Sequence, residues 1–310
     1  MKTHTKLTVT VGVSAYNEAQ NIEAFLKSVL AQKEGGFYIE KIVLISDGST
    51  DNTVEIAKSI KNHKIIVKHF KERLGKSSRL NQLYSSLSSD ILVQSDADVI
   101  FSHPYVIRDI ITPIAKNKKV WMSGGNPQPF PSRTFTEKAV NSTFEIYAKF
   151  RKSIRGGDNV FSADGRLLAY KKELVKKIVI PNDMIANDAF TYYCCLTFGY
   201  KYKYIESAIV FYRSPQTLMD HVRQNTRFRA APLRLSRYFG KEIIKRETYV
   251  PPKILFFEEA KQFFKHPLIT GYIFIVNMYC RARAFRIESK LDAKWALAKT
   301  SKKLIYENTH

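Results

Sequence analysis

The stretch Asp90-Ile91-Leu92-Val93-Gln94-Ser95-Asp96-Ala97-Asp98 is an apolar run that ends in two carboxylates. The run is typical of a buried β-strand. Three earlier segments have the same character: residues 7–14 (LTVTVGVS), 39–46 and 64–69. Apolar residues at helical spacing lie between these strands, in residues 21–32, in a segment that ends near residue 60, and around residues 80–87. Strands that alternate with helices predict an α/β fold with a parallel sheet covered on both faces.

Polar residues follow three of these strands, and ligands of parallel sheets bind outside the carboxyl ends of the strands. The three sets are residues 16–18, 47–51 and 96–98. Asp96 and Asp98 can hold a hard divalent cation such as Mg²⁺ or Mn²⁺, which prefers carboxylate, water and phosphate oxygens. The alternative is a solvated turn in which Asp98 caps the next element.

The segment 47–53 (DGSTDNT) has two interpretations. Asn52 and Glu55 have the spacing of a capping box, so Asn52 or Asp51 is expected to cap the following helix. Asp47 stands at the strand tip, where its carboxylate can accept a hydrogen bond from a nucleobase N–H or a ribose hydroxyl.

Composition limits the function classes. The chain has 310 residues, 50 Lys and Arg against 28 Asp and Glu, a net charge of +22 and 45% hydrophobic residues. This excludes disorder as the main state and predicts a polyanionic partner: a nucleic acid, an anionic membrane or a phosphate-bearing molecule. Cys194, Cys195 and Cys280 form no Cys-x-x-Cys pair, which argues against a disulfide framework or a cysteine zinc site.

Residues 1–6 lack the apolar stretch of a signal peptide, and the few cysteines favour a reducing compartment. We therefore expect a cytoplasmic protein, either free or peripheral on the cytoplasmic face of a membrane. Other chemistries lack their motifs. Gly75-Lys76-Ser77 resembles the end of a P-loop, but Phe70 stands where that motif needs glycine, and no GxGxxG, HExxH or GxSxG pattern fits.

Four ordered motifs carry a family resemblance: residues 13–18 (VSAYNE), 46–53 (SDGSTDNT), 75–81 (GKSSRLN) and 95–98 (SDAD). Together they resemble the family 2 glycosyltransferases, inverting enzymes of the GT-A fold. The likeness is close over residues 7 to about 100 and looser to about 230. It implies a Rossmann-like, mainly parallel sheet flanked by helices. We expect a catalytic domain over residues 1–230 and a basic, aromatic-rich helical extension over 231–310.

The resemblance also implies site residues. The family pattern usually has two aspartates before the glycine, and here Ser46 replaces the first, which leaves Asp47 for the nucleobase. Asp96 and Asp98 become the Asp-x-Asp that holds the nucleotide ribose and a Mg²⁺ or Mn²⁺ ion. The implied nucleotide-binding residues are Ser14, Tyr16, Glu18, Asp47, Lys76, Arg79 and Asp96.

The second half of the chain implies a base and a diphosphate contact. Asn187-Asp188 resembles a Glu-Asp pair whose aspartate is the general base, with Asn in place of Glu; Asp183 is the competing candidate. Residues 224–228 (QNTRF) resemble the Gln-x-x-Arg-Trp signature, with Phe in place of Trp, so Arg227 is expected at the diphosphate. His221 is a second diphosphate candidate. Alternatively, His221 is a structural helix residue, and Arg227 belongs to a solvated basic face or binds membrane phosphates.

The activity so implied is transfer of a sugar from a nucleotide-diphosphate sugar, expected to be UDP-linked, to an acceptor hydroxyl of a saccharide, a lipid-linked sugar or a cell-envelope polysaccharide. Residues from about 124 to 193, including Asp164-Gly165-Arg166, are expected to form the acceptor pocket. Two alternatives stay open: a catalytically silent relative, and a nucleic-acid-binding protein that uses the basic C-terminal third. Carboxylates gathered at one sheet edge do not suit a nucleic-acid groove, so no nucleic-acid partner is expected.

The C-terminal region is apolar, aromatic and basic. Residues 267–280 (PLITGYIFIVNMYC) are the most apolar stretch, but they are shorter than the ~20 residues of a spanning helix. Aromatic residues precede this stretch, and Arg281, Arg283 and Arg286 follow it. The pattern predicts either an interfacial helix on an anionic membrane or a helical hairpin packed on the catalytic domain or another subunit.

Overall fold

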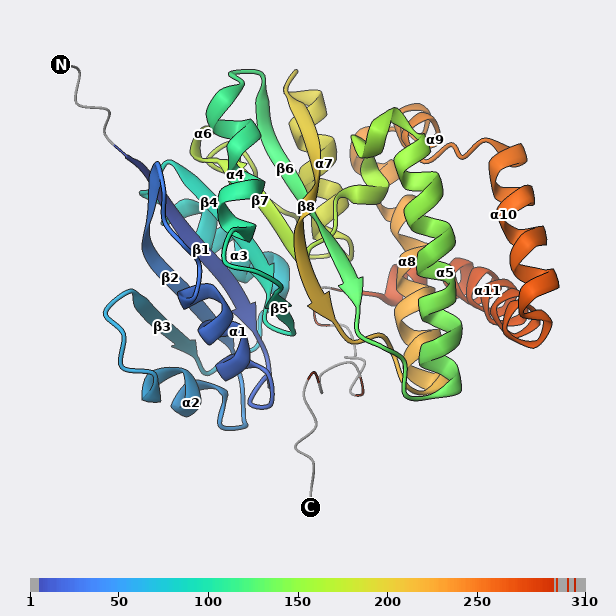
Figure 1. Cartoon of the computed structure of the whole chain (residues 1–310), viewed down its shortest axis with the longest axis horizontal. Coiled ribbons are helices and arrows are strands. Elements are labelled where there is room, and N and C mark those ends of the chain that lie inside the picture. The colour runs from blue at the N-terminus through green and yellow to red at the C-terminus, as the bar shows by residue number, and fades with distance from the viewer. Residues whose placement is uncertain (1–5, 293, 295–299, 301–303, 305–310) are drawn as a thin grey trace.

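A mixed β-sheet forms the centre of the molecule. The computed structural model describes residues 6–292, 294, 300 and 304. Eight strands of this described part form one sheet (Figure 1). Their order across the sheet is β3 (Ile65–Phe70), β2 (Phe37–Asp47), β1 (Leu7–Ala15), β4 (Ile91–Asp96), β7 (Leu167–Lys171), β6 (Val120–Pro129), β8 (Lys201–Tyr212) and β5 (Val99–Phe101).

The first four strands confirm the α/β prediction. β1 pairs in parallel with β2 and β4, and β2 pairs in parallel with β3. β7 is antiparallel to β4 and β6, β5 is antiparallel to β8, and β6 and β8 are parallel. Parallel strands place their carboxyl ends at one edge, so the loops after β1, β2 and β4 lie together.

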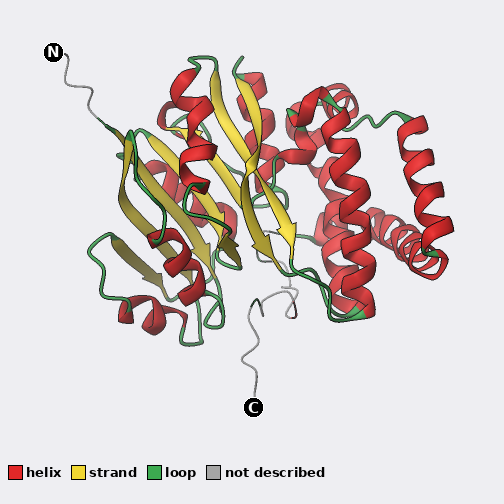
Figure 2. Ribbon diagram, viewed as in Figure 1, coloured by secondary structure: helices red, strands yellow, loops and turns green. Residues whose placement is uncertain are grey.

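Two hydrophobic cores cover the two faces of the sheet. One joins β1 and β4 to α1 (Ile22–Leu30), α2 (Thr53–Ser59) and α4 (Val106–Lys116). The other joins the opposite face to α3 (Lys76–Ser85), α6 (Lys172–Val175) and α7 (Asn187–Thr197). Figure 2 shows these helices against the strands. Successive side chains of a strand point to opposite faces, so the apolar residues of these strands contribute to both cores.

A group of helices lies beside β6 and β8 (Figure 1): α5 (Phe135–Ser153), α8 (Leu218–Phe239), α9 (Lys241–Glu247), α10 (Pro252–Lys265) and α11 (Pro267–Ile287). Short 3₁₀ turns occur at η1 (Arg155–Gly157), η2 (Val160–Ser162) and η3 (Glu288–Lys290). The expected helical C-terminal extension is confirmed. The expected division at residue 230 falls inside α8, which continues to Phe239.

One local expectation needs correction. The side chain of Asn52 makes no capping hydrogen bond at α2, so the Asn52–Glu55 capping box is wrong. Asp51 serves instead: its Oδ1 accepts a hydrogen bond from the Thr53 backbone N–H at 3.1 Å. Asn52 already has near-helical backbone angles (φ −75°, ψ 18°), whereas a capping residue needs an extended conformation.

The three cysteines are free and buried. Within the described part of the chain, every helix is too short or too polar to cross a bilayer.

Candidate functional site

The loops after β1 and β2 are bonded to each other at the carboxyl edge of the sheet. Asn17 has a left-handed backbone (φ 53°), and its Oδ1 accepts a hydrogen bond from the Thr50 N–H at 2.8 Å. The backbone N–H of Glu18 donates to Thr53 Oγ1 at 2.7 Å, and that of Ala19 donates to Asp51 Oδ2 at 3.1 Å. Residues 50–53 after β2 therefore fix the conformation of residues 17–19 after β1.

Asp47 and Arg79 form a buried ion pair beneath these loops. Arg79 Nε lies 2.7 Å from Asp47 Oδ1, and the two side chains are 1% and 4% exposed. The backbone N–H groups of Leu74 and Gly75 each donate to the same carboxylate at 2.8 Å. The Arg79 guanidinium also lies 4.0 Å from the Phe70 ring centre. Asp47 thus fixes the turn before α3, and its contact with a nucleobase stays a prediction.

The other residues expected at the nucleoside lie at the end of β1. Ser14 pairs in register with Ile45 of β2 and Asp96 of β4, so it stands between the second and fourth motifs. The Arg73 guanidinium lies 4.0 Å from the centre of the Tyr16 ring. Glu18 is buried, and its carboxylate accepts a hydrogen bond from Asn21 Nδ2 at 2.9 Å. The structure therefore brings these side chains to one edge.

Lys76, at the start of α3, pairs with Asp96, at the end of β4. Burial lowers the pKa of Lys76, but the negative charges of Asp96 and Asp188 raise it, and the net shift is upward. The ammonium group therefore stays charged at neutral pH. Asp188 is the second carboxylate near Lys76, so Lys76 connects the end of β4 with α7.

Asp188 lies in the first turn of α7 and faces the loop 164–166. The backbone N–H groups of Gly165 and Ala189 donate to its carboxylate at 3.2 and 2.8 Å. A Cβ placed on Gly165 would lie 3.5 Å from Lys76 Nζ and 3.7 Å from Asp188 Oδ2. The two side chains therefore converge on the backbone of Gly165, and a large side chain at that position would separate them.

The charge environment of Asp188 suits proton uptake. Burial and then the nearby Asp164 raise its pKa, while the Ala189 N–H, Lys76 and Arg227 lower it; the net shift is upward. A carboxylate whose pKa moves toward neutrality is a stronger proton acceptor than an ordinary surface aspartate.

Arg166 and Arg227 are two further cations near Asp96. Arg166 pairs with Asp164 at 2.8 Å and stacks on the Tyr212 ring at 3.7 Å. Burial lowers its pKa, but Asp164, Tyr212, Asp98 and Asp96 together raise it. Burial lowers the pKa of Arg227, with Asp188 and Asp96 acting in the opposite direction. We call the following set the charged cluster: Lys76, Asp96, Asp98, Asp164, Arg166, Asp188 and Arg227.

Asp96 and Asp98 are the two carboxylates that the sequence predicts at a metal ion. The described residues contain no group of three or more His, Cys, Asp or Glu side chains placed to hold a metal. A Mg²⁺ ion bound with a nucleotide needs only one or two carboxylates, because phosphate and water oxygens complete its shell. The two carboxylates fit that chemistry, and Lys76 is the cation that Asp96 contacts here.

Two candidate residues lie elsewhere. His221 is buried, its Nδ1 lies 3.2 Å from the Tyr272 hydroxyl of α11, and burial lowers its pKa to about 4. It is therefore neutral at pH 7 and carries no charge for a diphosphate. Asp183, the competing base, accepts hydrogen bonds from Arg234 at 3.1 Å and Tyr238 at 2.6 Å. Both residues serve contacts of α8.

Tyr147 of α5 is a residue that the sequence did not single out. Its ring makes edge contacts with Phe150 and Phe161, with centroids 4.6 and 5.8 Å away. Burial raises its pKa, Arg151 opposes the shift, and Asp164 and Asp188 add to it, so the hydroxyl is within electrostatic range of the charged cluster. An aromatic residue in a helix gives no sequence signal for such a position. The roles of Asp164 and Arg166 within the expected acceptor segment were likewise not assigned from sequence.

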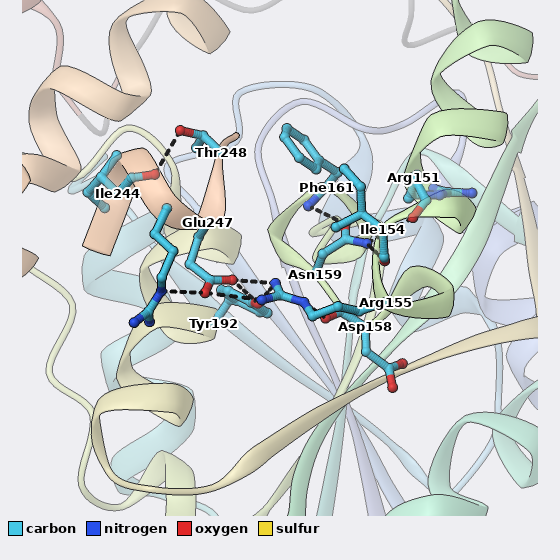
Figure 3. Close-up of polar contacts among 11 residues, drawn as sticks. Arg151, Ile154, Arg155, Asp158, Asn159, Phe161, Tyr192, Ile244, Glu247 and Thr248 are labelled. Carbon is cyan, nitrogen blue, oxygen red and sulfur yellow. Dashed lines mark hydrogen bonds and ion pairs between the residues drawn. The ribbon is translucent and has the colours of Figure 1, made fainter. Parts of the chain in front are cut away.

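A second polar network holds the segment that leads into residues 164–166 (Figure 3). The Arg155 guanidinium pairs with Glu247 of α9, and the Tyr192 hydroxyl of α7 donates to the same carboxylate at 2.8 Å. Asn159 Nδ2 donates to the backbone oxygens of Arg151 and Ile154, at 2.8 and 2.6 Å. The network joins the end of α5, α7 and α9, and so fixes the loop beside Asp188.

Comparison with known proteins identifies the family and the fold. The profile described as "Glycosyl transferase family 2" matches residues 10–179. The poly-beta-1,6-N-acetyl-D-glucosamine synthase of Staphylococcus aureus (strain COL) is 27% identical over 278 residues, which is 87% of this chain and 64% of the synthase. The Staphylococcus epidermidis synthase is 28% identical over 225 residues, or 70% of this chain and 52% of that protein. The chain thus spans less than two thirds of these relatives.

Solved structures share the fold. A mannosyltransferase from Pyrobaculum calidifontis in complex with GDP-Man and Mn²⁺ superposes with a TM-score of 0.56, at 20% identity, over 94% of this chain and 77% of its own. Glucosyl-3-phosphoglycerate synthase from Mycobacterium tuberculosis, in complex with Mn²⁺, UDP and phosphoglyceric acid, gives 0.54 at 17% identity, over 76% and 79%. The GT-A fold expected from the sequence is confirmed. With the family profile covering more than half of its length, this chain belongs to glycosyl transferase family 2.

Proposed function

We propose that this protein is a metal-dependent, inverting glycosyltransferase that moves a sugar from a nucleotide-diphosphate sugar to an acceptor hydroxyl. The observation that carries the proposal is the position of Asp188, which faces Lys76 across Gly165 beside the Asp-x-Asp strand end. A proton acceptor and a cationic diphosphate site thus lie side by side. Family membership leaves the nucleic-acid-binding alternative without support.

The donor nucleotide lies along the carboxyl edge of the sheet in this proposal. Ser14, Tyr16 and Glu18 line the nucleoside, and Asp47 with Arg79 fixes the turn beneath the base. Asp96 contacts the ribose, and Asp96 and Asp98 hold Mg²⁺ or Mn²⁺. The bound ion supplies positive charge for the diphosphate. Solved relatives that contain Mn²⁺ with GDP-Man or UDP support this assignment.

Asp188 takes the proton in the transfer step. The acceptor oxygen forms a bond to the anomeric carbon while its proton passes to the Asp188 carboxylate. The bond from the anomeric carbon to the diphosphate oxygen breaks, and its electron pair leaves with the diphosphate. General-base help of this kind contributes ~10²–10⁴-fold. Because the pKa of Asp188 is raised, we expect the acidic limb of the pH–rate profile above the ordinary aspartate value of 3.8.

Lys76 and Arg227 stabilise the leaving group. Both are cations close to Asp96 and Asp188, so their charge is already aimed at the place where the diphosphate gains charge. When the donor binds, Lys76 exchanges its contact with Asp96 for a phosphate oxygen, and Asp96 becomes available for the nucleotide and the cation.

The acceptor approaches from the side of α5 and the loop 164–166. Asp164, which pairs with Arg166, and Tyr147 are within electrostatic range of Asp188. They offer hydrogen-bonding groups and an aromatic ring for a saccharide. The names of the Staphylococcus relatives support a role in polysaccharide synthesis and make UDP-N-acetylglucosamine the first donor to test. The proposal keeps the cytoplasmic location that the three free cysteines favour.

Nucleotide binding tests this function. The full chain is titrated with UDP and UDP-sugars, with Mn²⁺ and with EDTA, and thermal stability is recorded. We expect Mn²⁺-dependent stabilisation, about 2.7 kcal/mol at 100 times the Kd, that Asp98→Asn abolishes. The matched control Glu23→Gln changes an exposed carboxylate on α1 and should bind normally. Metal-independent behaviour, or single-stranded DNA binding with a steep salt dependence, contradicts the proposal.

Slow hydrolysis of the donor separates an enzyme from a silent relative. Wild-type protein should release UDP from the donor in the absence of acceptor. Binding without any release, with or without saccharide acceptors, would make the chain a nucleotide-sugar-binding protein only.

A further inference from the structure

α10 and α11 present an apolar face that the chain itself leaves uncovered. None of the α10 side chains that the structure describes is buried, although the helix contains four phenylalanines. Phe264 and Leu268, at the turn between the helices, are 84% and 81% exposed. We call the following set the hairpin face: Phe256, Phe257, Phe263, Phe264, Leu268, Phe274, Ile275, Met278, Tyr279 and Phe285. Each of these side chains is more than half exposed.

The opposite side of α11 already has its partner. Val276 and Cys280 pack against Val222 of α8, and Ala284 packs against Ala230. The Asn225 side chain of α8 donates to Asn277 Oδ1 at 2.8 Å. The hairpin is therefore docked on the domain, as one of the two sequence expectations proposed. The α11 residues of the hairpin face differ from those that pack on α8. A soluble surface rarely collects so many large apolar side chains without a function.

Cations flank the hairpin face. Residues 252–287 contain six Lys or Arg and two Glu. Lys261 and Lys265 lie beside Phe263 and Phe264 in the sequence of α10, and one of the glutamates, Glu258, is paired with Lys149 of α5 at 3.0 Å. Arg281 and Arg286 are exposed at the other end of α11. Aromatic side chains with a basic border match the chemistry of an anionic bilayer surface, where rings enter the interface and cations meet phosphates.

We propose that the hairpin face docks on the surface of an anionic lipid bilayer, with the helices in the plane of the membrane. This goes beyond the transfer reaction, because none of its residues belongs to the charged cluster. The helices are not spans, since the described ones are too short or too polar to cross. A second copy of the chain suits the face less well, because a two-fold contact would bring the same cations opposite each other.

The hairpin is joined to the site by α8. The same helix carries Arg227 of the charged cluster and the residues that pack on α11, so a docked hairpin would hold the charged cluster at a fixed distance from the lipid surface. A lipid-linked acceptor would then meet the site at the membrane.

Co-sedimentation of the full chain with phosphatidylcholine vesicles, with and without phosphatidylglycerol, tests the proposal. We expect binding only when phosphatidylglycerol is present. Phe256→Ser with Phe264→Ser should weaken this binding by at least about tenfold through lost apolar insertion. Arg281→Gln with Arg286→Gln should weaken it about thirtyfold, since each surface cation contributes about 1 kcal/mol. The control Val179→Ser removes an apolar side chain that is 77% exposed outside the hairpin and should bind as wild type.

Two measurements keep the outcome interpretable. Circular dichroism and Mn²⁺-dependent UDP binding should be unchanged in both double variants, which shows that they are folded. Equal binding of wild type to neutral vesicles, or unchanged binding of both double variants, overturns the proposal. A dimer in lipid-free solution that disappears in Phe256→Ser with Phe264→Ser also overturns it, because the hairpin face would then belong to a second copy. Absence of vesicle binding would leave the proposed transferase function intact, because nucleotide binding is measured in a separate experiment.

Discussion

Two parts of this molecule are held in place in different ways. The strand-edge half consists of β1–β4 with their loops and helices, and the helical half consists of α5 and α7–α11. At the strand edge, motif side chains bond to the backbone of neighbouring loops, as Asp47 does with Leu74 and Gly75. In the helical half, ion pairs join residues far apart in the sequence, such as Arg155–Glu247 and Arg234–Glu288. The first half carries its site in short motifs, whereas the second half brings single residues to the same place by packing. The site forms where the two halves meet.

The largest stability effect is expected at the strand edge. Asp47→Ala leaves the Arg79 guanidinium buried without its carboxylate, and breaking a buried pair in this way costs ~3–5 kcal/mol. Urea unfolding of both proteins at pH 7 measures the loss. Glu23→Gln, in an exposed pair within the same half, should cost no more than ~1 kcal/mol. Equal losses for both variants would remove the distinction between buried and exposed pairs there.

A cation at the junction of the halves should affect catalysis more than folding. Arg227→Met removes a charge aimed at the diphosphate, and loss of one such group typically costs ~10²–10³-fold in turnover. Initial rates of UDP release measure the effect. Arg223→Met, four residues earlier on α8, is the matched control, because Arg223 pairs with Asp220 at 3.1 Å instead. A rate for Arg227→Met within twofold of wild type would place the diphosphate elsewhere.

The network of Figure 3 should give a smaller, pH-dependent effect. Burial raises the pKa of Glu247, but the contacts with Arg155 and Tyr192 lower it by more. The net result is a pKa below the ordinary value of 4.5. Ionised Glu247 therefore stabilises the fold above that pH, and the contribution is lost as the pH falls through the lowered pKa. Glu247→Gln should cost ~1–3 kcal/mol at pH 7 and less at acid pH.

Unfolding free energies of wild type and Glu247→Gln, measured across the acid range, test this account. Arg246→Met is the control, because Arg246 is exposed and makes only a 3.3 Å contact with Glu247. A cost for Glu247→Gln that grows as the pH falls would mean that the sign of the pKa shift is wrong.

The smallest effect is expected where the hairpin meets α5. Lys149 and Glu258 form an exposed pair at 3.0 Å, so Lys149→Met should change the free energy of unfolding by at most ~0.5 kcal/mol. Lys152→Met, in the exposed pair with Glu206, should behave alike. A large loss for Lys149→Met alone would show that α10 depends on this contact for its position.

The contrast between the halves also explains what the sequence could predict. The first four strands follow from apolar runs, and the Asp96–Asp98 edge follows because this motif directly continues the apolar run of β4. The antiparallel insertion of β7 between β4 and β6 could not be predicted, since long-range pairing leaves no local pattern. The position of Asp164 and Gly165 beside Asp188 depends on packing between α7 and the loop before β7. The error at Asn52 arose because Asp51, one residue earlier, makes the capping contact.

The central claim is that Asp188 takes the acceptor proton beside a bound nucleotide-diphosphate sugar. The most direct measurement compares wild type and Asp188→Asn in two assays on the same samples: UDP release from UDP-N-acetylglucosamine with Mn²⁺ and a saccharide acceptor, and Mn²⁺-dependent UDP affinity. We predict that turnover falls ~10²–10⁴-fold while UDP affinity and thermal stability are kept. Turnover of Asp188→Asn equal to wild type would contradict the account.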